Sequence, residues 1–144
     1  MKKYTYILML FFASTLFAQD WQPSYADAVT EAQKQDKPIL LVFAGSDWCA
    51  PCIKLDKTIW QSEEFSTYAA MNLILYRADF PRKKANQLST ALADKNNTLA
   101  EKFNPDGHFP LVLVLDANEK ILGETGYLNS TPKAYIEHIN SFIK

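Results

Sequence analysis

Apolar residues along the chain fall into short runs separated by longer polar or amphipathic segments. The run Ile39–Ala44 is continuously apolar, which is typical of a strand buried on both faces. A second run starts at residue 73 and ends near residue 79, and a third covers residues 111–115. A turn at residues 116–119 and a further run at 121–125 complete a hairpin with the third run. The pattern therefore predicts four strands.

The segments between these runs carry helix-start signals or helical periodicity. The predicted helices are residues 24–34 capped by Ser24, a helix from Cys49 or Ala50 to about Trp60, a helix opening at Ser62, one or two helices within 81–104 broken at Asn96 and Asn97, and a closing helix that starts at Thr131 with Pro132 in its first position. Because strands and helices alternate, we expect a single α/β domain with parallel pairing in the core of its sheet.

The composition of the chain limits the kinds of partner that it can bind. The 144 residues include 15 basic and 16 acidic side chains, a formal net charge of −1. No basic stripe is present, so we expect no binding to nucleic acid. The one basic cluster, Arg82-Lys83-Lys84, fits a solvated helix start. About 125 mature residues can bury a core without help from a metal, and we expect a monomer.

The first residues resemble a cleavable export signal. Lys2 and Lys3 give a positive start, residues 7–17 are mostly apolar, and Ala18 ends the segment before the chain turns polar. The apolar stretch is shorter than the ~20 residues that span a bilayer. We therefore expect a signal peptide at residues 1–18, a domain at 19–144, and a periplasmic or otherwise exported protein.

Cys49 and Cys52 are the two cysteines of the chain, and Pro51 lies between them in the first turn of the predicted helix. A thiolate on Cys49 at the helix N-terminus can accept a hydrogen bond from the N–H of Cys52 or Ile53, so the pKa of the thiol should lie below its usual value of about 8.5. One helical turn separates the two Cα atoms by about 5 Å, within the ~4.4–6.8 Å that a disulfide needs. We expect an exposed, reversible dithiol.

Two other interpretations of the pair remain open. As a structural crosslink, a loop this short would contribute about 2 kcal/mol, compared with about 3 kcal/mol for a fifteen-residue loop. As metal ligands, two thiolates complete half of a tetrahedral site, and His108 and His138 lack the spacing of a zinc-ligand pair. Redox chemistry is the favoured interpretation, and we expect neither a metal nor an organic cofactor.

The run Trp48-Cys49-Ala50-Pro51-Cys52, with Phe109-Pro110 opening a later strand, resembles the thioredoxin superfamily. Residues 43–56 look like the exported thioredoxin-like proteins of bacteria, close to the carboxy-terminal domains of thiol:disulfide interchange proteins. The resemblance implies a three-layer sandwich in which helices flank a central mixed sheet. It also implies a cis peptide bond before Pro110, with the neighbouring backbone pairing with a substrate strand.

The resemblance further implies a thiol-disulfide oxidoreductase in which Cys49 attacks a substrate disulfide and Cys52 resolves the mixed disulfide. Ala50-Pro51 is similar to the Gly-Pro pair of reducing members, which favours reduction of protein disulfides. The expected substrate-binding residues are Trp48, Ala50, Pro51, Phe109 and Pro110. Partners would be protein thiols and disulfides and an unidentified electron donor or acceptor, with a membrane protein as one option. A non-catalytic binding domain and a disulfide-forming oxidase are the alternatives.

One feature departs from that family. Many thioredoxins carry a buried acid in the strand before the dithiol, and Val42 and Phe43 occupy the candidate positions here. The proton of Cys52 must therefore move through water or another group. Of the nearby charged side chains, we expect Asp47 to be a solvated loop acid that opposes the thiolate. Lys54 and Lys57 are interpreted as a solvated helix face, and His108 as a loop residue.

Overall fold

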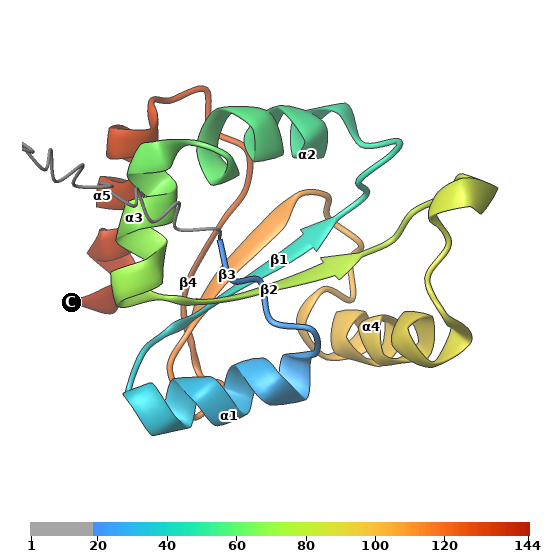
Figure 1. Cartoon of the computed structure of the whole chain (residues 1–144), viewed down its shortest axis with the longest axis horizontal. Helices are drawn as coiled ribbons and strands as arrows, with labels where there is room; N and C mark the ends of the chain where they lie inside the picture. Colours follow the sequence, from blue (N-terminus) through green and yellow to red (C-terminus); the bar gives the residue numbers. More distant parts are fainter. Residues whose placement is uncertain (1–18) are drawn as a thin grey trace, which may run out of the picture.

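The computed structural model describes residues 19–144, so the expected signal peptide lies outside the described residues. The sheet has four strands in the order β2 (Ile74–Asp79), β1 (Ile39–Ala44), β3 (Leu111–Leu115) and β4 (Ile121–Thr125). β1 runs parallel to β2 and antiparallel to β3, and β3 runs antiparallel to β4 (Figure 1). The mixed sheet is confirmed. The expected parallel core is correct for the β1–β2 pair alone, because β3 returns beside β1 in the opposite direction.

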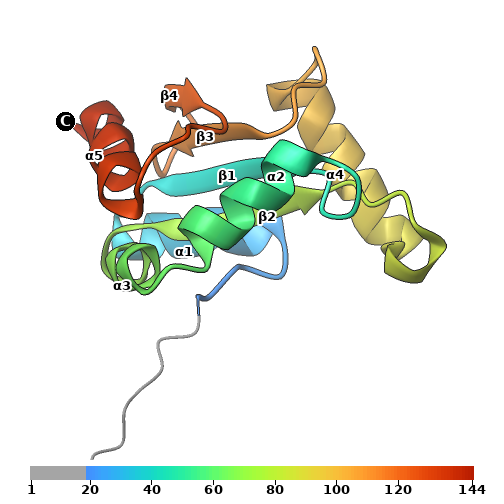
Figure 2. The same ribbon diagram turned by 90° about the horizontal axis from the view of Figure 1, so that it is seen from above.

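Helices cover both faces of this sheet. The helices are α1 (Tyr25–Gln35) and α4 (Thr90–Phe103) on one face, and α2 (Ala50–Leu55), α3 (Glu63–Asn72) and α5 (Pro132–Ile143) on the other, with a π-helical turn η1 (Asp56–Trp60) after α2 and a 3-10 turn η2 (Lys84–Asn86) before α4. Seen from above, α2 crosses over the strands (Figure 2). The three-layer sandwich is confirmed. Among residues 19–144, no helix has the length and apolar character that a membrane span requires.

The position of β1 between two layers of helices explains why its sequence is apolar throughout. Its side chains alternate between the two layers, and none is more than 7% exposed. The residues that face α2, α3 and α5 are Leu40, Val42 and Ala44. The residues that face α1 and α4 are Ile39, Leu41 and Phe43. The strand is therefore buried on both faces, as predicted, and its carboxyl end leads directly into the loop that carries the cysteines.

Helix starts follow the predicted caps. The side-chain oxygens of Ser24, Ser62 and Thr131 accept hydrogen bonds from backbone N–H groups in the first turns of α1, α3 and α5. Ser89 does the same for α4. Each cap satisfies a donor that a helix leaves without an intrahelical partner, which fixes where the helix begins.

The predicted break at Asn96 and Asn97 is wrong, because α4 continues through both residues. Asn96 is 2% exposed. Its Oδ1 accepts a hydrogen bond from the Tyr76 hydroxyl at 2.6 Å, and its Nδ2 donates to the backbone oxygen of Asp79 at 3.1 Å. These two contacts to β2 give the buried amide the partners it requires, which outweighs the weak intrinsic preference of asparagine against helices.

The helix after the cysteines also differs from the prediction. It reaches Trp60, but it changes from α to π geometry at Asp56. The N–H of Gln61 donates to the backbone oxygen of Asp56 at 2.9 Å, five residues earlier. Such turns occur often at functional sites.

Replacing Asn96 with alanine should lower the free energy of unfolding by about 2 kcal/mol, because the Tyr76 hydroxyl and the Asp79 carbonyl lose a buried partner. Asn97 is exposed on the same helix, so Asn97→Ala serves as the matched control and should change the value by less than about 0.5 kcal/mol. Urea denaturation followed by circular dichroism measures both. Equal effects of the two substitutions would contradict the role given to Asn96.

Candidate functional site

The cysteines lie where the carboxyl end of β1 meets the start of α2. Cys49 is the N-cap residue of α2, and its Sγ accepts a hydrogen bond from the N–H of Cys52 at 3.3 Å. The two residues form a disulfide with their Cα atoms 5.2 Å apart, close to the separation expected from one helical turn. The helix start thus stabilises negative charge on Cys49 and holds Cys52 within bonding distance.

Burial of the disulfide differs from the expectation of an exposed sulfur. Cys49 and Cys52 are each 5% exposed in this disulfide-bonded form. Both belong to the core cluster on the α2 side of the sheet, and Trp48 and Phe109 pack against that cluster. Ala50 and Pro51, between the cysteines, are exposed. Ala50 and Pro51 therefore form the exposed surface next to the buried disulfide.

The peptide bond between Phe109 and Pro110 is cis, as the resemblance implied. Pro110 opens onto the same cavity as Cys52, although the chain separates them widely. Sequence reasoning found this residue through the resemblance, since proline at the start of a strand is by itself unremarkable.

Trp48 is held firmly beside the disulfide. Its indole Nε1 donates to the backbone oxygen of Phe80 at 2.7 Å, and its ring packs edge-on against Phe109 with centroids 5.4 Å apart. The guanidinium of Arg82 lies 3.7 Å from the ring centroid. A Cβ on Gly45 would approach the indole to 2.3 Å, so glycine is required there. Trp48 therefore packs into the fold and also forms one wall of the surface next to Cys49.

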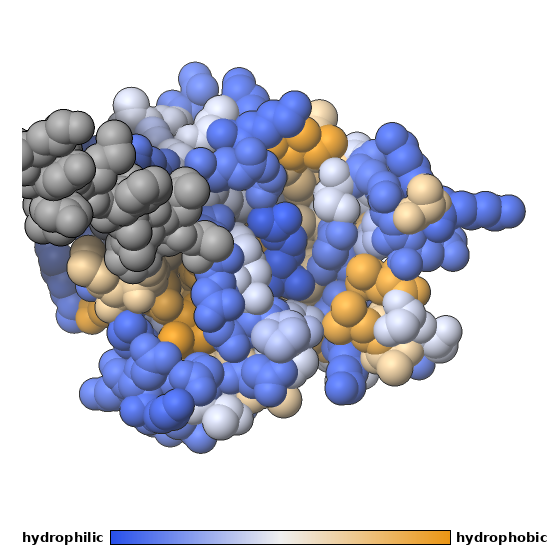
Figure 3. Space-filling view, viewed as in Figure 1, coloured by the Kyte–Doolittle hydropathy of each residue, from blue (hydrophilic) through white to orange (hydrophobic). Residues whose placement is uncertain are grey.

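A hollow of about 670 Å³ opens beside Trp48, away from the cysteines, with Phe80, Leu88 and Phe109 among its walls. Most of the surface in the view of Figure 3 is hydrophilic, with smaller hydrophobic areas beside α2 and over the region of α4. The two expected aromatic contact residues, Trp48 and Phe109, thus lie together at the edge of this hollow.

Asp47 is an acid in an accessible loop, as the sequence suggested, but its carboxylate is also hydrogen-bonded. Its carboxylate accepts hydrogen bonds from the N–H groups of Arg82 and Lys83, both at 2.9 Å, and from the side chain of Asn86 at 3.0 Å. The hydrogen bond from the Arg82 N–H is the main cause of a lowered pKa at Asp47. The sequence analysis missed these hydrogen bonds because the three donors are remote in sequence.

Asp79, at the end of β2, bonds in turn to the loop before the cysteines. The sequence analysis missed this residue. Its carboxylate accepts from the N–H of Ser46 at 2.9 Å and from the Ser46 hydroxyl at 2.5 Å. Asp47 and Asp79 thereby tie the loop before the cysteines to the loop after β2. No sequence signal marks either contact. Together they fix the approach to Cys49.

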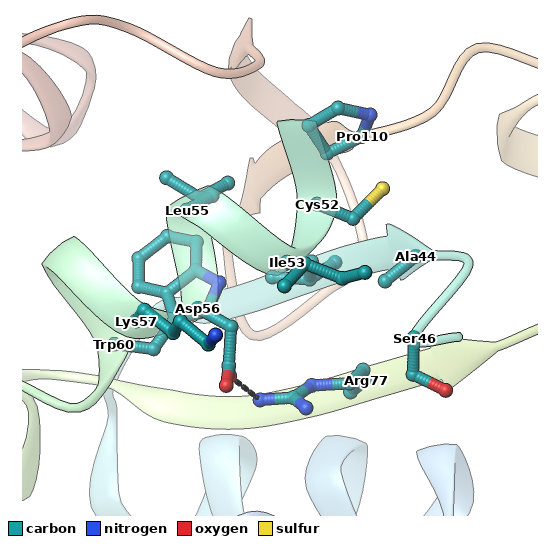
Figure 4. A pocket seen from close by; sticks show the side chains of 11 residues that line it. Ala44, Ser46, Cys52, Ile53, Leu55, Asp56, Lys57, Trp60, Arg77 and Pro110 are labelled. Carbon is teal, nitrogen blue, oxygen red and sulfur yellow. Dashed lines mark hydrogen bonds and ion pairs between the residues drawn. The ribbon is translucent and has the colours of Figure 1, made fainter. Parts of the chain in front are cut away.

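A cavity of about 220 Å³ lies on the inner side of Cys52 (Figure 4). Asp56 and Arg77 line it and form an ion pair, with Nη2 and Oδ1 2.8 Å apart. Both side chains are a little over one quarter exposed. The sequence analysis missed this pair, although Asp56 follows Cys52 by four residues and so faces the same side of the helix.

The remaining charged candidates take separate positions. Lys57 lines the cavity, while the Lys54 ammonium lies 5.3 Å from the centroid of the Tyr127 ring. His108 is exposed in the loop before Pro110, where its backbone bonds to the side chain of Asn104.

Within residues 19–144, no three His, Cys, Asp or Glu side chains gather so that they could hold a metal ion.

The chain is similar in sequence and in fold to known proteins. A family model described as thioredoxin-like matches residues 20–117. The disulfide bond reductase DsbH of Chlamydia pneumoniae is 36% identical over 124 residues, which are 86% of this chain and 72% of DsbH. A solved structure of a DsbH oxidoreductase superposes with a TM-score of 0.80 at 35% identity, covering 86% of this chain and 83% of that one.

A more distant structure shares the fold alone. The carboxy-terminal domain of DsbD from Neisseria meningitidis, in its oxidised form, gives a TM-score of 0.54 at 19% identity. The superposition covers 81% of this chain and 90% of that domain.

Replacing Asp47 with alanine should lower stability at neutral pH, because the ionised carboxylate holds the Arg82 and Lys83 amides. Since folding lowers the pKa of Asp47 from 3.8, its contribution is complete above that value and is lost as the pH falls through the folded pKa. The difference in urea midpoint between wild type and Asp47→Ala should therefore shrink below pH 3.8. Asp106→Ala, at an exposed loop position, is the control. A difference that is constant with pH would contradict the role of the ionised form.

Proposed function

The chain belongs to the thioredoxin-like family and is a thiol-disulfide oxidoreductase, and from that premise we propose that it works as an exported reductase of protein disulfides. The single observation that supports this most is the position of Cys49. It caps α2, accepts the N–H of Cys52, and has Cys52 within bonding distance. Two cysteines so placed can accept or donate two electrons without movement of the backbone.

Reduction of a substrate proceeds in two exchanges. In the dithiol form, the Cys49 thiolate attacks one sulfur of a substrate disulfide, and the other substrate sulfur leaves as a thiolate. Cys52 then attacks Cys49 Sγ and releases the second substrate sulfur. The products are a substrate dithiol and the Cys49–Cys52 disulfide seen here. An external dithiol must then return the two electrons.

Two observations support the reducing direction. The relative that shares 36% identity over most of this chain is described as a disulfide bond reductase. In addition, Ala50-Pro51 resembles the dipeptide of reducing members of the family. Both residues are exposed beside the sulfurs, where a partner would contact them.

The substrate surface would consist of Trp48, Ala50, Pro51, Phe109 and Pro110. Trp48 and Phe109 present aromatic faces at the edge of the hollow, and the backbone next to the cis proline would pair with an extended substrate segment. Aromatic walls favour substrates with apolar residues near the disulfide.

Export would follow from a signal peptide at residues 1–18, which leaves a mature domain at 19–144. In an oxidising compartment, cysteine pairs are held as disulfides unless a dedicated donor reduces them. The protein would therefore depend on a partner that supplies electrons, and a membrane-bound dithiol protein is the expected class.

Replacing Cys52 with serine should trap mixed disulfides between Cys49 and substrate proteins, because the resolving sulfur is absent. Non-reducing electrophoresis of the exported fraction should show higher-mass species that disappear on reduction. The double variant Cys49→Ser/Cys52→Ser is the matched control and should show none. A Cys52→Ser protein that forms no covalent species would instead indicate a non-catalytic binding domain.

The direction of reaction depends on the reduction potential of the dithiol. We expect a value of about −270 mV, as in reducing thioredoxins. A strong oxidant of this family would have a much higher value, about −120 mV. Equilibration with glutathione buffers, followed by alkylation and mass measurement of the two cysteines, determines it. A potential near the higher value would show that the protein forms disulfides rather than reducing them.

A further inference from the structure

The resolving step poses a problem of proton transfer. Cys52 must lose its thiol proton before its sulfur can attack Cys49, yet the residue is 5% exposed in the disulfide form. Burial opposes formation of a thiolate, and bulk water has little access to the sulfur. A proton acceptor connected to Cys52 would therefore speed this step.

The cavity behind Cys52 offers one. Of the residues that line it, Asp56 is the one carboxylate, and it projects from the turn that follows Cys52 (Figure 4). With about 220 Å³, the cavity has room for several water molecules, each of which occupies about 30 Å³ in the liquid. Polar groups of Ser46, Asp56 and Arg77 could bind such waters. A short chain of hydrogen bonds can thus link the Cys52 sulfur to the Asp56 carboxylate.

Asp56 is held in place from several directions. Its Oδ1 accepts from Arg77 at 2.8 Å, and its Oδ2 accepts from the side chain of Gln61. Arg77 is in turn fixed by Trp21, whose ring centroid lies 4.5 Å from the guanidinium carbon. Trp21 forms an isolated bridge with Leu75 on β2, so the segment before α1 supports the pair. The carboxylate is therefore positioned rather than freely solvated.

Charged side chains of several elements lie around Asp56. Arg77 comes from β2, where it lies opposite Val42 of β1, and Lys57 comes from η1. The ammonium of Lys54 lies over the Tyr127 ring. Glu63 and Glu64 of α3 are exposed, and the Tyr135 hydroxyl of α5 donates to the backbone oxygen of Gly126. Of these charged groups, the Arg77 guanidinium forms the ion pair with Asp56 and fixes the position of the carboxylate.

We propose that Asp56, held by Arg77, accepts the thiol proton of Cys52 through water in the cavity during the resolving step. The Cys52 thiolate then forms its bond to Cys49 Sγ, the Cys49–substrate bond breaks, and the substrate sulfur leaves with the electron pair. The proton passes from Asp56 through the cavity water to solvent or to that sulfur. When an external dithiol reduces the disulfide, the same path returns a proton to Cys52.

This inference rests on the proposed function for its place in the cycle, but it can be tested without a natural substrate. The reduced protein is mixed with excess dithiobis(nitrobenzoic acid), and the release of coloured thionitrobenzoate is followed. The first release reports attack by Cys49. The second release is intramolecular, independent of reagent concentration, and reports attack by Cys52 on the mixed disulfide.

For wild type, the second rate should stay nearly constant from about pH 5.5 to about pH 8, because the carboxylate takes the proton through the cavity water. In Asp56→Asn, the rate should fall about tenfold for each unit of decreasing pH, and near pH 6 it should be about 300-fold below wild type. The two profiles should converge above about pH 8.5, where the thiol ionises unaided. Attack by Cys49 in the first release should change less than about twofold.

Matched variants separate this role from a structural one. Asp56→Glu should keep the flat profile, and Asp56→Ala should repeat the loss if the amide variant folds poorly. Glu119→Gln breaks an ion pair with Lys102 outside the cavity and should leave both rates unchanged. Parallel profiles for wild type and Asp56→Asn would overturn the proposal. A high reduction potential would overturn the proposed direction and leave this result intact.

Discussion

The structure depends on one arrangement, in which a buried strand delivers a cysteine to the first turn of a helix. β1 is fixed on both faces by the two core clusters, so the position of its carboxyl end is set. The chain then turns once, and Cys49 caps α2 with its sulfur accepting the N–H of Cys52. This contact favours negative charge on one sulfur and keeps the other within reach, which is the basis of the redox chemistry.

Two carboxylates keep this arrangement from moving. Asp79 binds the loop that leads to Cys49, and Asp47 in that loop binds the backbone before η2. Trp48 adds a hydrogen bond to Phe80 in the same region. The side of the site that meets a substrate is therefore built from two loops that hold each other, and its aromatic walls have fixed positions.

The side of the site next to Cys52 contains an ion pair. Asp56 begins the π-helical turn, and Arg77 of β2 forms an ion pair with it. The two cysteines thus experience different surroundings. Cys49 has a backbone donor and aromatic neighbours, whereas Cys52 faces a cavity that contains an ion pair. A difference of this kind suits an attacking sulfur and a resolving sulfur.

The sequence by itself determined the strands, the helix caps, the dithiol and the place of the cis proline, because these depend on neighbours within a few residues or on a resemblance carried by short runs. It did not determine the direction of β3 beside β1, the continuity of α4 at Asn96, or the partners of Asp47 and Asp56. Those side chains bond to groups 17 to 39 residues away, and a carboxylate or amide has no local signal for such a partner. Only the packed tertiary structure brings the two ends of each contact together.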